Sequence, residues 1–424
     1  MKVLIINTSE RNGGAAVAAS RLMQALCKNG VQARMLVRDR QSDDPRVVAL
    51  RPRWLMRWRF LCERFVVLQR LHGQRRHLFD VDPALCGADV TRLREFREAD
   101  VIHLHWTGQG LLSLGDLRKI VRSGKPVVWT MHDIWPATGL CHLTLTCRNY
   151  RHGCGHCRYL PGGGSRHDLS ATVFQRKQRL LQGGTLAFVA CSRWLEGEAK
   201  SSALLSGHKV TSIPNPIDTR LFSPGSRSDA RREEQLPQER RLILFVCQRA
   251  NNLYKGMDHL AEACRLMARE HPETLSTVGV VVLGSHAGEV ASALPFPAFT
   301  PGYVGDEQRM VRLYRSADVF VLPSLSENLP NTIMEAMACG VPCVGFKVGG
   351  IPEEIDHRRN GYVAAYRDSG DLARGLYWTL FEADARELSR KAVEKVAKSY
   401  SQSSVSLRYT ELYQELLAQQ HFKL

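Results

Sequence analysis

The sequence contains no long apolar segment. In its 424 residues no uninterrupted apolar run reaches the length of about 18 that a membrane-spanning helix needs, so we expect no such helix. A secretion signal is also missing, because the apolar start, 1–7, is too short and too poorly flanked for one and instead suits a first strand. Hydrophobic residues make up 44% and charged residues 24% of the chain, which is ordinary for a soluble globular protein of about two to three domains. These absences predict a cytoplasmic protein.

Acidic residues are scarce relative to basic ones. There are 42 Asp and Glu against 58 Lys and Arg, which gives a formal net charge of +16. The imbalance is strongest in 51–77, where eight arginines accompany a single acid, Glu63, and are interleaved with Trp54, Trp58 and other apolar residues. This pattern is typical of a basic amphipathic helix on an anionic membrane, and we predict such contact with the cytoplasmic face of the inner membrane. A helix packed on its own domain and a nucleic-acid site are the alternatives, but nothing else resembles a nucleic-acid module, so we expect no nucleic acid as a partner.

Without a secretion signal the protein is not expected to meet oxidising conditions, so its 12 cysteines should stay reduced. Most are scattered and are most simply small core residues. The other four have the spacing Cys-x5-Cys-x6-Cys-x2-Cys in a segment too poor in apolar residues to form a core of its own. Four thiolates at this spacing suit a structural zinc ion, with free thiols or disulfides as the alternatives. The predicted metal ligands are Cys141, Cys147, Cys154 and Cys157.

The first half of the chain has the pattern of a parallel α/β domain. An apolar strand at 3–7 is followed by the pair Gly13-Gly14, a helix over about 17–29 and a second strand at 31–37, which is a βαβ unit. The glycine pair lacks the Gly-x-Gly-x-x-Gly dinucleotide fingerprint. Two later strands end in polar side chains that should converge on one sheet edge, where α/β sheets bind ligands. These side chains are His103, His105, His132 and Asp133.

The second half begins another α/β domain with the strand 241–247. Arg249 and Lys255 follow this strand and suit a diphosphate, with solvated surface charge as the alternative. Further on, an apolar strand at 317–323 leads through a polar loop to a predicted helix over about 331–338. Glu327 and Glu335 bracket the start of this helix, where free backbone amides favour an anion. Either glutamate alone would ordinarily be a solvated residue.

The stretch Glu327-Asn-Leu-Pro-Asn-Thr-Ile-Met-Glu335, with Gly340-Val-Pro342 and Gly349-Gly350 after it, resembles the Glu-x7-Glu region of retaining GT-B glycosyltransferases, particularly glycosyltransferase family 4. The run from His132 through the four cysteines is similar to enzymes of the colanic-acid and exopolysaccharide type. The resemblance implies an α/β fold of two doubly wound, Rossmann-like domains facing across a cleft. It also implies the following division: 1–215 as the acceptor-side domain with a Cys-rich insertion at about 141–157, 216–240 as hinge, 241–392 as the nucleotide-sugar domain, and 393–424 as a helix that crosses back to the first domain.

The activity implied by the resemblance is transfer of a sugar, with retention, from a UDP- or GDP-linked donor to a saccharide or lipid-linked saccharide in surface polysaccharide biosynthesis. Arg249 and Lys255 would neutralise the leaving diphosphate, so no catalytic metal is expected. Beside this clamp Gln248 stands where glycine is usual, and there is one extra residue before Lys255. The implied residues are His132, Glu327, Arg249 and Lys255 for catalysis, Gly13, Gly14, Asn328, Leu329, Pro330, Asn331 and Glu335 for the donor, and His105 and Asp133 on the acceptor side.

Two other functions remain open on the sequence alone. One is a zinc-stabilised basic binding protein without catalysis, and the other is a sugar-nucleotide epimerase or a phosphorylase of similar fold. A plain binding module has no need for Glu327, Glu335 and Lys255 on one sheet edge, which favours the transferase.

Overall fold

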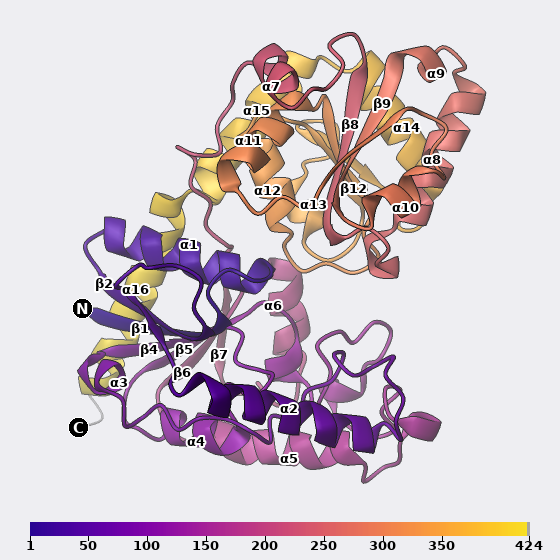
Figure 1. Cartoon of the computed structure of the whole chain (residues 1–424). Coiled ribbons are helices and arrows are strands. Elements are labelled where there is room, and N and C mark those ends of the chain that lie inside the picture. The colour runs from indigo at the N-terminus through magenta and orange to yellow at the C-terminus, as the bar shows by residue number, and fades with distance from the viewer. Residues whose placement is uncertain (422–424) are drawn as a thin grey trace. The chain divides into compact units, whose positions relative to one another are not determined.

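The computed structural model describes residues 1–421 and divides the chain into two compact units (Figure 1). Unit 1 comprises Met1–Pro216 together with the segment that starts at Gln402, and unit 2 comprises Ile217–Ser401. Each unit has its own sheet and its own core.

Unit 1 is built on a seven-stranded sheet in which every neighbouring pair of strands is parallel. The strand order β3-β2-β1-β4-β5-β6-β7 reverses direction between β1 and β4, which is the switch point where such sheets bind ligands. The strands are β1 (Lys2–Ser9), β2 (Gln32–Asp39), β3 (Val47–Ala49), β4 (Val101–Leu104), β5 (Val127–Met131), β6 (Leu186–Ala190) and β7 (Lys209–Ser212).

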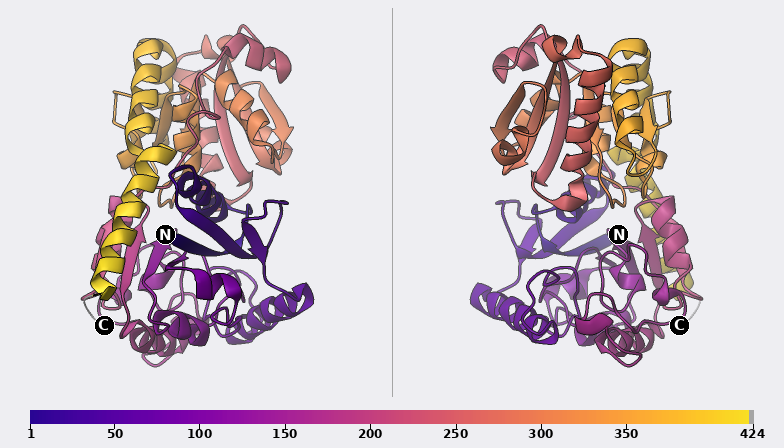
Figure 2. Two further views of the ribbon diagram at one scale, coloured as in Figure 1. Left: turned by 90° about the vertical axis from the view of Figure 1, so that its left-hand side faces the viewer. Right: turned by 90° about the vertical axis from the view of Figure 1, so that its right-hand side faces the viewer.

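Helices cover both faces of this sheet. Successive residues of a strand point to opposite faces, so Val3 and Ile5 belong to one apolar cluster and Leu4 and Ile6 to another. The first cluster is closed by α1 and α16, which lie side by side, and the second by α2, α4, α5 and α6 (Figures 1 and 2). The helices are α1 (Gly14–Lys28), α2 (Arg53–Arg70), α3 (Arg94–Glu98), α4 (Leu114–Val121), α5 (Leu169–Leu181), α6 (Arg193–Lys200) and α16 (Gln402–His421).

Unit 2 repeats the architecture with a six-stranded parallel sheet of order β10-β9-β8-β11-β12-β13, which reverses between β8 and β11. The strands are β8 (Arg241–Arg249), β9 (Val278–Ser285), β10 (Ala298–Gly302), β11 (Val319–Leu322), β12 (Cys343–Phe346) and β13 (Gly361–Ala364). The helices are α7 (Arg227–Glu233), α8 (Met257–Glu270), α9 (Thr274–Thr277), α10 (Ala287–Ala291), α11 (Glu307–Ser316), α12 (Asn331–Ala338), α13 (Ile351–Glu354), α14 (Ser369–Tyr377), a π turn at Trp378–Glu382 and α15 (Ala385–Ser399).

Two connecting segments differ from the expected pattern. The tail predicted as one helix over 393–424 is divided between α15 in unit 2 and α16 in unit 1, and its last three residues lie outside the described part. The segment predicted as a hinge, 216–240, contains α7, and all of it except Pro216 belongs to unit 2. Arg231 explains this packing, because its buried guanidinium donates to the carbonyl oxygen of Ser316 at 2.9 Å and to Asp318 at 2.6 Å.

Within residues 1–421, no helix has both the length and the apolar character that crossing a membrane requires.

Candidate active site

Lys255 lies in the loop that follows β8, at the carboxyl edge of the unit 2 sheet. A short 3-10 turn, Leu253–Lys255, connects the strand to α8. Gly256 ends the turn with a φ of 72°, and a Cβ at this position would stand 1.9 Å from the carbonyl oxygen of Pro323. Only glycine tolerates both conditions. The close approach therefore holds the Lys255 loop against the loop after β11, which carries Glu327.

Lys255 and Glu327 form an ion pair across these two loops. Lys255 Nζ lies 2.5 Å from Glu327 Oε1, and the two side chains are 31% and 13% exposed. Burial alone would lower the pKa of Lys255, but the charge of Glu327 and its hydrogen bond outweigh burial and raise this pKa. Lys255 is thus a charged ammonium with donors left for a ligand. The pair places a positive charge and a carboxylate where parallel sheets bind their ligands.

Arg249 ends β8 and is exposed, and its guanidinium makes no hydrogen bond or ion pair within residues 1–421. The pairing of β8 with β9 shifts register between Val246 and Arg249, and Ser285 Oγ donates to the carbonyl oxygen of Gln248 at 2.9 Å. A bulge of this kind turns a side chain away from the regular ladder. The shift lies between Val246 and Arg249, a stretch that includes Gln248, where the resembled family usually has glycine, and the Arg249 guanidinium is available for an anion.

Replacing Arg249 by alanine should weaken the binding of a nucleotide diphosphate, the ligand predicted for this sheet edge, without affecting the fold. A charge-assisted hydrogen bond to a phosphate is lost, which corresponds to a dissociation constant about tenfold higher or more. Calorimetric titration measures this dissociation constant. Arg359→Ala is the matched control, because Arg359 is also an exposed arginine of unit 2 whose side chain has no bonded partner in the described chain. Equal affinities of the two variants would contradict the role of Arg249.

The loop that begins at Glu327 is fixed by the turn after β12. Gly349 has a φ of 56°, and a Cβ there would stand 1.8 Å from the carbonyl oxygen of Glu327. The Gly350 amide donates to the carbonyl oxygen of Asn328 at 2.7 Å. α12 begins at Asn331 with no capping side chain and no acid in its first turn, in the described chain. The positive end of its dipole therefore lies at this loop and favours an anion.

Three other residues predicted to bind the donor are buried. Leu329 and Pro330 are packed within unit 2, so only their backbone could contact a ligand. Glu335 is also buried, and Tyr314 donates its hydroxyl hydrogen to Glu335 Oε2 at 2.8 Å. Tyr314 escaped the sequence analysis because it lies on another helix, α11, in an ordinary apolar position. The predicted role of Glu335 in donor binding stays a prediction.

In unit 1, Asp133 organises the polar group at the end of β5. Its Oδ2 accepts hydrogen bonds from Trp106 Nε1 at 2.9 Å and from His142 Nδ1 at 2.8 Å, and its Oδ1 accepts one from the Trp135 amide at 2.8 Å. Burial tends to lower the pKa of His142, but the charge of Asp133 outweighs it and raises this pKa. His142 was not predicted as a site residue, although it lies within the run that carries the resemblance. Asp133 therefore holds the loop after β5 in place.

His132 has protein contacts at both ring nitrogens. Nε2 lies 2.8 Å from Nδ1 of His105, and Nδ1 lies 3.5 Å from Cys191 Sγ. Burial lowers the pKa of His132 to about 4, although Asp133 acts in the opposite direction. His132 is thus a neutral imidazole at pH 7 in a fixed orientation, which suits a hydrogen-bonding group better than a proton donor. The predicted catalytic role of His132 and the acceptor-side role of His105 stay predictions.

Because unit 1 contains buried histidines, we expect it to lose stability in acid. Burial lowers the pKa of His103 to about 3 and that of His132 to about 4, below the value of 6.5 for an exposed histidine. Because the unfolded chain then binds more protons between pH 6.5 and these values, the free energy of unfolding falls as the pH drops through this window. One histidine shifted this far accounts for about 2 kcal/mol between pH 7 and pH 5.

Urea unfolding at pH 7 and pH 5 tests this expectation. In His103→Gln the loss between the two pH values should be smaller by about 2 kcal/mol, because one titrating ring is gone. His152→Gln, which replaces an exposed histidine of the same unit, should leave the loss unchanged. If the wild type and His103→Gln lose the same free energy of unfolding between pH 7 and pH 5, the buried His103 ring does not cause that loss.

The glycine pair stands at the start of α1, beside the end of β1. Gly13 is the residue before the helix, with a φ of 90°, and a Cβ there would meet open space, so its backbone conformation alone requires glycine. No side chain of the described chain caps α1, and its first turn contains no acid. Gly14 is the first helical residue. Their role in donor binding stays a prediction.

The four clustered cysteines are not assembled as a metal site. All are reduced, and residues 1–421 contain no group of three or more His, Cys, Asp or Glu side chains that could hold a metal ion. Burial and the neighbouring thiols raise the pKa of Cys141 to about 12, and Cys154 Sγ accepts a hydrogen bond from the Gly139 amide at 3.2 Å. The spacing thus brings thiols near one another without forming a ligand set, and the structural zinc ion has no support in this structure.

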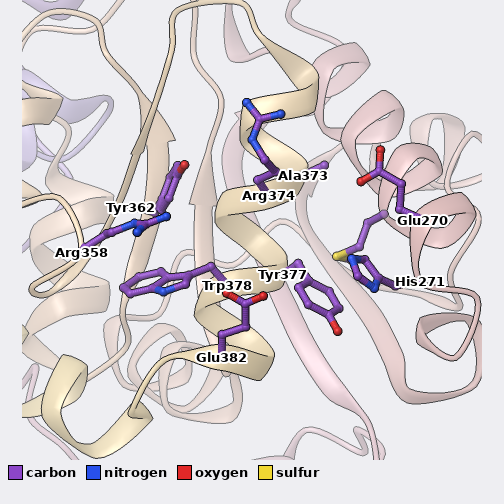
Figure 3. Close-up of a pocket in the computed structure, with 10 residues that line it drawn as sticks. Glu270, His271, Arg358, Tyr362, Ala373, Arg374, Tyr377, Trp378 and Glu382 are labelled. Atoms are coloured by element: carbon purple, nitrogen blue, oxygen red, sulfur yellow. The ribbon is translucent and has the colours of Figure 1, made fainter.

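A separate cavity of about 210 Å³ lies in unit 2 at the C-terminal ends of α8 and α14 (Figure 3). His271 stacks on Tyr377 with ring centroids 3.6 Å apart, and the Arg358 guanidinium lies 5.6 Å from the Trp378 ring. Because α8 begins beside Lys255 and ends here, the cavity is at the opposite end of the sheet from the site described above.

Both units match models of known protein families. Residues 12–221 match the family model described as Glycosyltransferase Family 4, and residues 240–380 match the model described as Glycosyl transferases group 1. D-inositol 3-phosphate glycosyltransferase of Saccharomonospora viridis is 24% identical, and the alignment covers 96% of this chain and 90% of that protein.

Two solved structures share the fold. Sucrose-phosphate synthase from Thermosynechococcus elongatus superposes with a TM-score of 0.67 at 19% identity, covering 98% of this chain and 99% of that one. HepE of Anabaena, in complex with UDP and glucose, gives a TM-score of 0.62 at 15% identity, covering 98% of this chain and all of the other (100%). At these identities the likeness concerns the fold.

Two glycosyltransferase models thus match this chain, the Family 4 model mainly in unit 1 and the group 1 model in unit 2, and the solved structures show the same fold. The predicted fold class, two Rossmann-like domains with parallel sheets, is confirmed. The chain is thus a glycosyltransferase.

Proposed function

We propose that this glycosyltransferase transfers a hexose from a UDP-sugar to a saccharide acceptor with retention of the anomeric configuration. The observation that carries the proposal is the Lys255–Glu327 ion pair at the carboxyl edge of the unit 2 sheet. Arg249, free of protein partners in the described chain, and the uncapped start of α12 surround the same edge with positive potential. The bound UDP of HepE, a protein of the same fold, favours uridine over guanosine.

In the proposed reaction the bond between the sugar C1 and the diphosphate oxygen breaks, and negative charge accumulates on UDP. Lys255 and Arg249 stabilise that charge, and the dipole of α12 adds to their effect. The acceptor hydroxyl oxygen forms the new bond to C1 on the face that UDP leaves, and its proton passes to the departing phosphate. Glu327 accepts a hydrogen bond from a donor-sugar hydroxyl. Positioning and charge stabilisation supply most of the catalysis in this scheme, without a catalytic metal.

We propose that the acceptor is a saccharide. In the assembly of a surface polysaccharide this saccharide would be linked to a lipid. The support is the likeness of the segment from His132 to Cys157 to exopolysaccharide enzymes. The relative that is named for D-inositol 3-phosphate suggests a phosphorylated polyol as a second class of acceptor. Both classes therefore enter the test.

Thermal unfolding in the presence of a panel of UDP- and GDP-sugars identifies the donor. A rise in the melting temperature with UDP-sugars supports the proposal, and a rise confined to GDP-sugars overturns the choice of base. Proton NMR of the product then reports the anomeric configuration, and an inverted product contradicts retention.

An assay of donor turnover separates the rival functions. Release of UDP that depends on an acceptor supports a transferase, whereas conversion of the donor with no acceptor indicates an epimerase. A requirement for free phosphate indicates a phosphorylase, and donor binding without any turnover indicates a binding protein.

A further inference from the structure

Helix α2 is attached to unit 1 by one face only. Met56 and Val67 enter the core of the unit, and the buried Glu63 accepts hydrogen bonds from two backbone amides of the following loop. The buried Arg64 lies 3.6 Å from Asp82 and donates to backbone carbonyls of the same loop. This inner face is therefore fixed by both packing and polar contacts, so the helix cannot turn its outer face inward without losing them.

The outer face of α2 is an apolar stripe, formed by Trp54, Trp58, Leu61 and Phe65. Their spacing of four, three and four residues places them on one side of a helix. The side chains are 65%, 60%, 51% and 59% exposed, respectively. α2 lies at the periphery of unit 1 (Figure 2). The exposures show that the described residues leave these four side chains largely uncovered. Four large apolar residues exposed in one row mark an interaction surface.

The surroundings of the stripe are positive. Of the eight arginines in 51–77, Arg64 is buried, and the other seven are exposed or half-buried. None of these seven guanidinium groups has a hydrogen bond or ion pair within residues 1–421. The one acid of the segment, Glu63, is fully buried. The seven are Arg51, Arg53, Arg57, Arg59, Arg70, Arg75 and Arg76.

We propose that the stripe and its arginines dock unit 1 on an anionic phospholipid membrane, with α2 lying in the plane of the interface. Trp and Phe side chains prefer the boundary between headgroups and acyl chains, and guanidinium groups at the same level pair with lipid phosphates. Each arginine near such a surface strengthens binding, and the apolar stripe adds the burial that holds the helix there. This surface is distinct from the donor site and requires no turnover.

Charge complementarity favours a membrane over a second copy of the chain. In a symmetric dimer the same patch would meet itself, and arginines without acidic neighbours would face one another. Like charges in contact disfavour such a complex, whereas an anionic bilayer satisfies every arginine at once.

Flotation with vesicles tests the proposal on the full chain. Two compositions are used, phosphatidylcholine alone and phosphatidylcholine with about 30 mol% phosphatidylglycerol. The wild type should bind the anionic vesicles and not the neutral ones, and about 0.5 M salt should release most of it. Trp54→Ser/Trp58→Ser and Arg53→Gln/Arg57→Gln should each weaken partitioning by about tenfold or more.

Matched variants in unit 2 control for a general loss of apolar surface or charge. Leu275→Ser/Tyr303→Ser removes two exposed apolar side chains, and Arg359→Gln/Arg386→Gln removes two exposed arginines, and both should bind vesicles as the wild type does. Unchanged melting temperatures and UDP affinities of the α2 variants show that they are folded and that the donor site is separate.

Three results would overturn the proposal. The first is equal binding to neutral and anionic vesicles, and the second is wild-type partitioning of the α2 variants. The third is a wild-type chain that sediments as a dimer and ignores vesicles, with Trp54→Ser/Trp58→Ser monomeric, because a second copy would then occupy the stripe.

Discussion

Replacing Lys255 by alanine is expected to lower turnover about a thousandfold while unit 2 stays folded. The ammonium stands at the sheet edge where the charge of the leaving diphosphate develops, and removing one such group from a preorganised site costs roughly two to three orders of magnitude. Release of UDP from the donor identified in the panel measures turnover. The melting temperature should change little, because both partners of the ion pair reach solvent.

Lys391→Ala is the control for this experiment. Lys391 is 31% exposed, as is Lys255, and pairs with Glu394 at 3.3 Å on α15 of the same unit. Its replacement should leave turnover unchanged. Near-wild-type turnover of Lys255→Ala would remove the lysine from the mechanism.

Gly349→Ala should disrupt the same site through the backbone. The residue has a φ of 56°, and the new Cβ would lie 1.8 Å from the carbonyl oxygen of Glu327, so the loop must move. A shift of about 1 Å at the carboxylate would separate it from Lys255 and lower turnover about a hundredfold. Turnover and the melting temperature are both measured, since strain of the left-handed backbone alone costs about 1 kcal/mol.

A second glycine separates the clash from the backbone strain. Gly302 in unit 2 has a φ of 82°, and a Cβ there meets nothing within 4 Å. Gly302→Ala should therefore show only the small loss of stability, with turnover retained. If Gly349→Ala behaves in the same way, the contact with the Glu327 loop does not shape the site.

Local signals in the sequence predict the elements around the site well. The helix expected at about 331–338 is α12, with the same limits, because an apolar pattern is followed by Gly340 and Pro342, which stop a helix. The glycine pair stands at the start of α1, as the βαβ pattern indicates. Such features depend on residues close together in the chain.

Contacts between distant residues could not be read from these patterns. Lys255 and Glu327 are 72 positions apart, and their pairing depends on the order of β8 and β11 in the sheet and on the space left by Gly256. Tyr314 reaches Glu335 from another helix. Glu327 was predicted for catalysis and Glu335 for donor binding. Neither protein partner was predicted, because spacing alone gives neither the order of strands in a sheet nor the packing of one helix against the next.

Tertiary contacts in three segments go beyond what their composition indicates. The segment 216–240 is predicted as a hinge, and within it Arg231 is buried because Asp318 and three carbonyl oxygens accept its hydrogen bonds. The Cys-x2-Cys spacing suggests a metal site, yet the thiols do not form a ligand group in the described residues. In 51–77 the composition suggested either packing or membrane contact, and α2 has one face buried and the other exposed.

Calorimetric titration of the donor into the wild type and into the double variant Arg249→Ala/Lys255→Ala tests the central claim most directly. The claim is that the edge of the unit 2 sheet holds the diphosphate of a UDP-sugar. One donor should bind per wild-type chain, and binding to the folded double variant should be weaker by about a hundredfold or more. Equal affinities for the two proteins would place the diphosphate elsewhere and contradict the account.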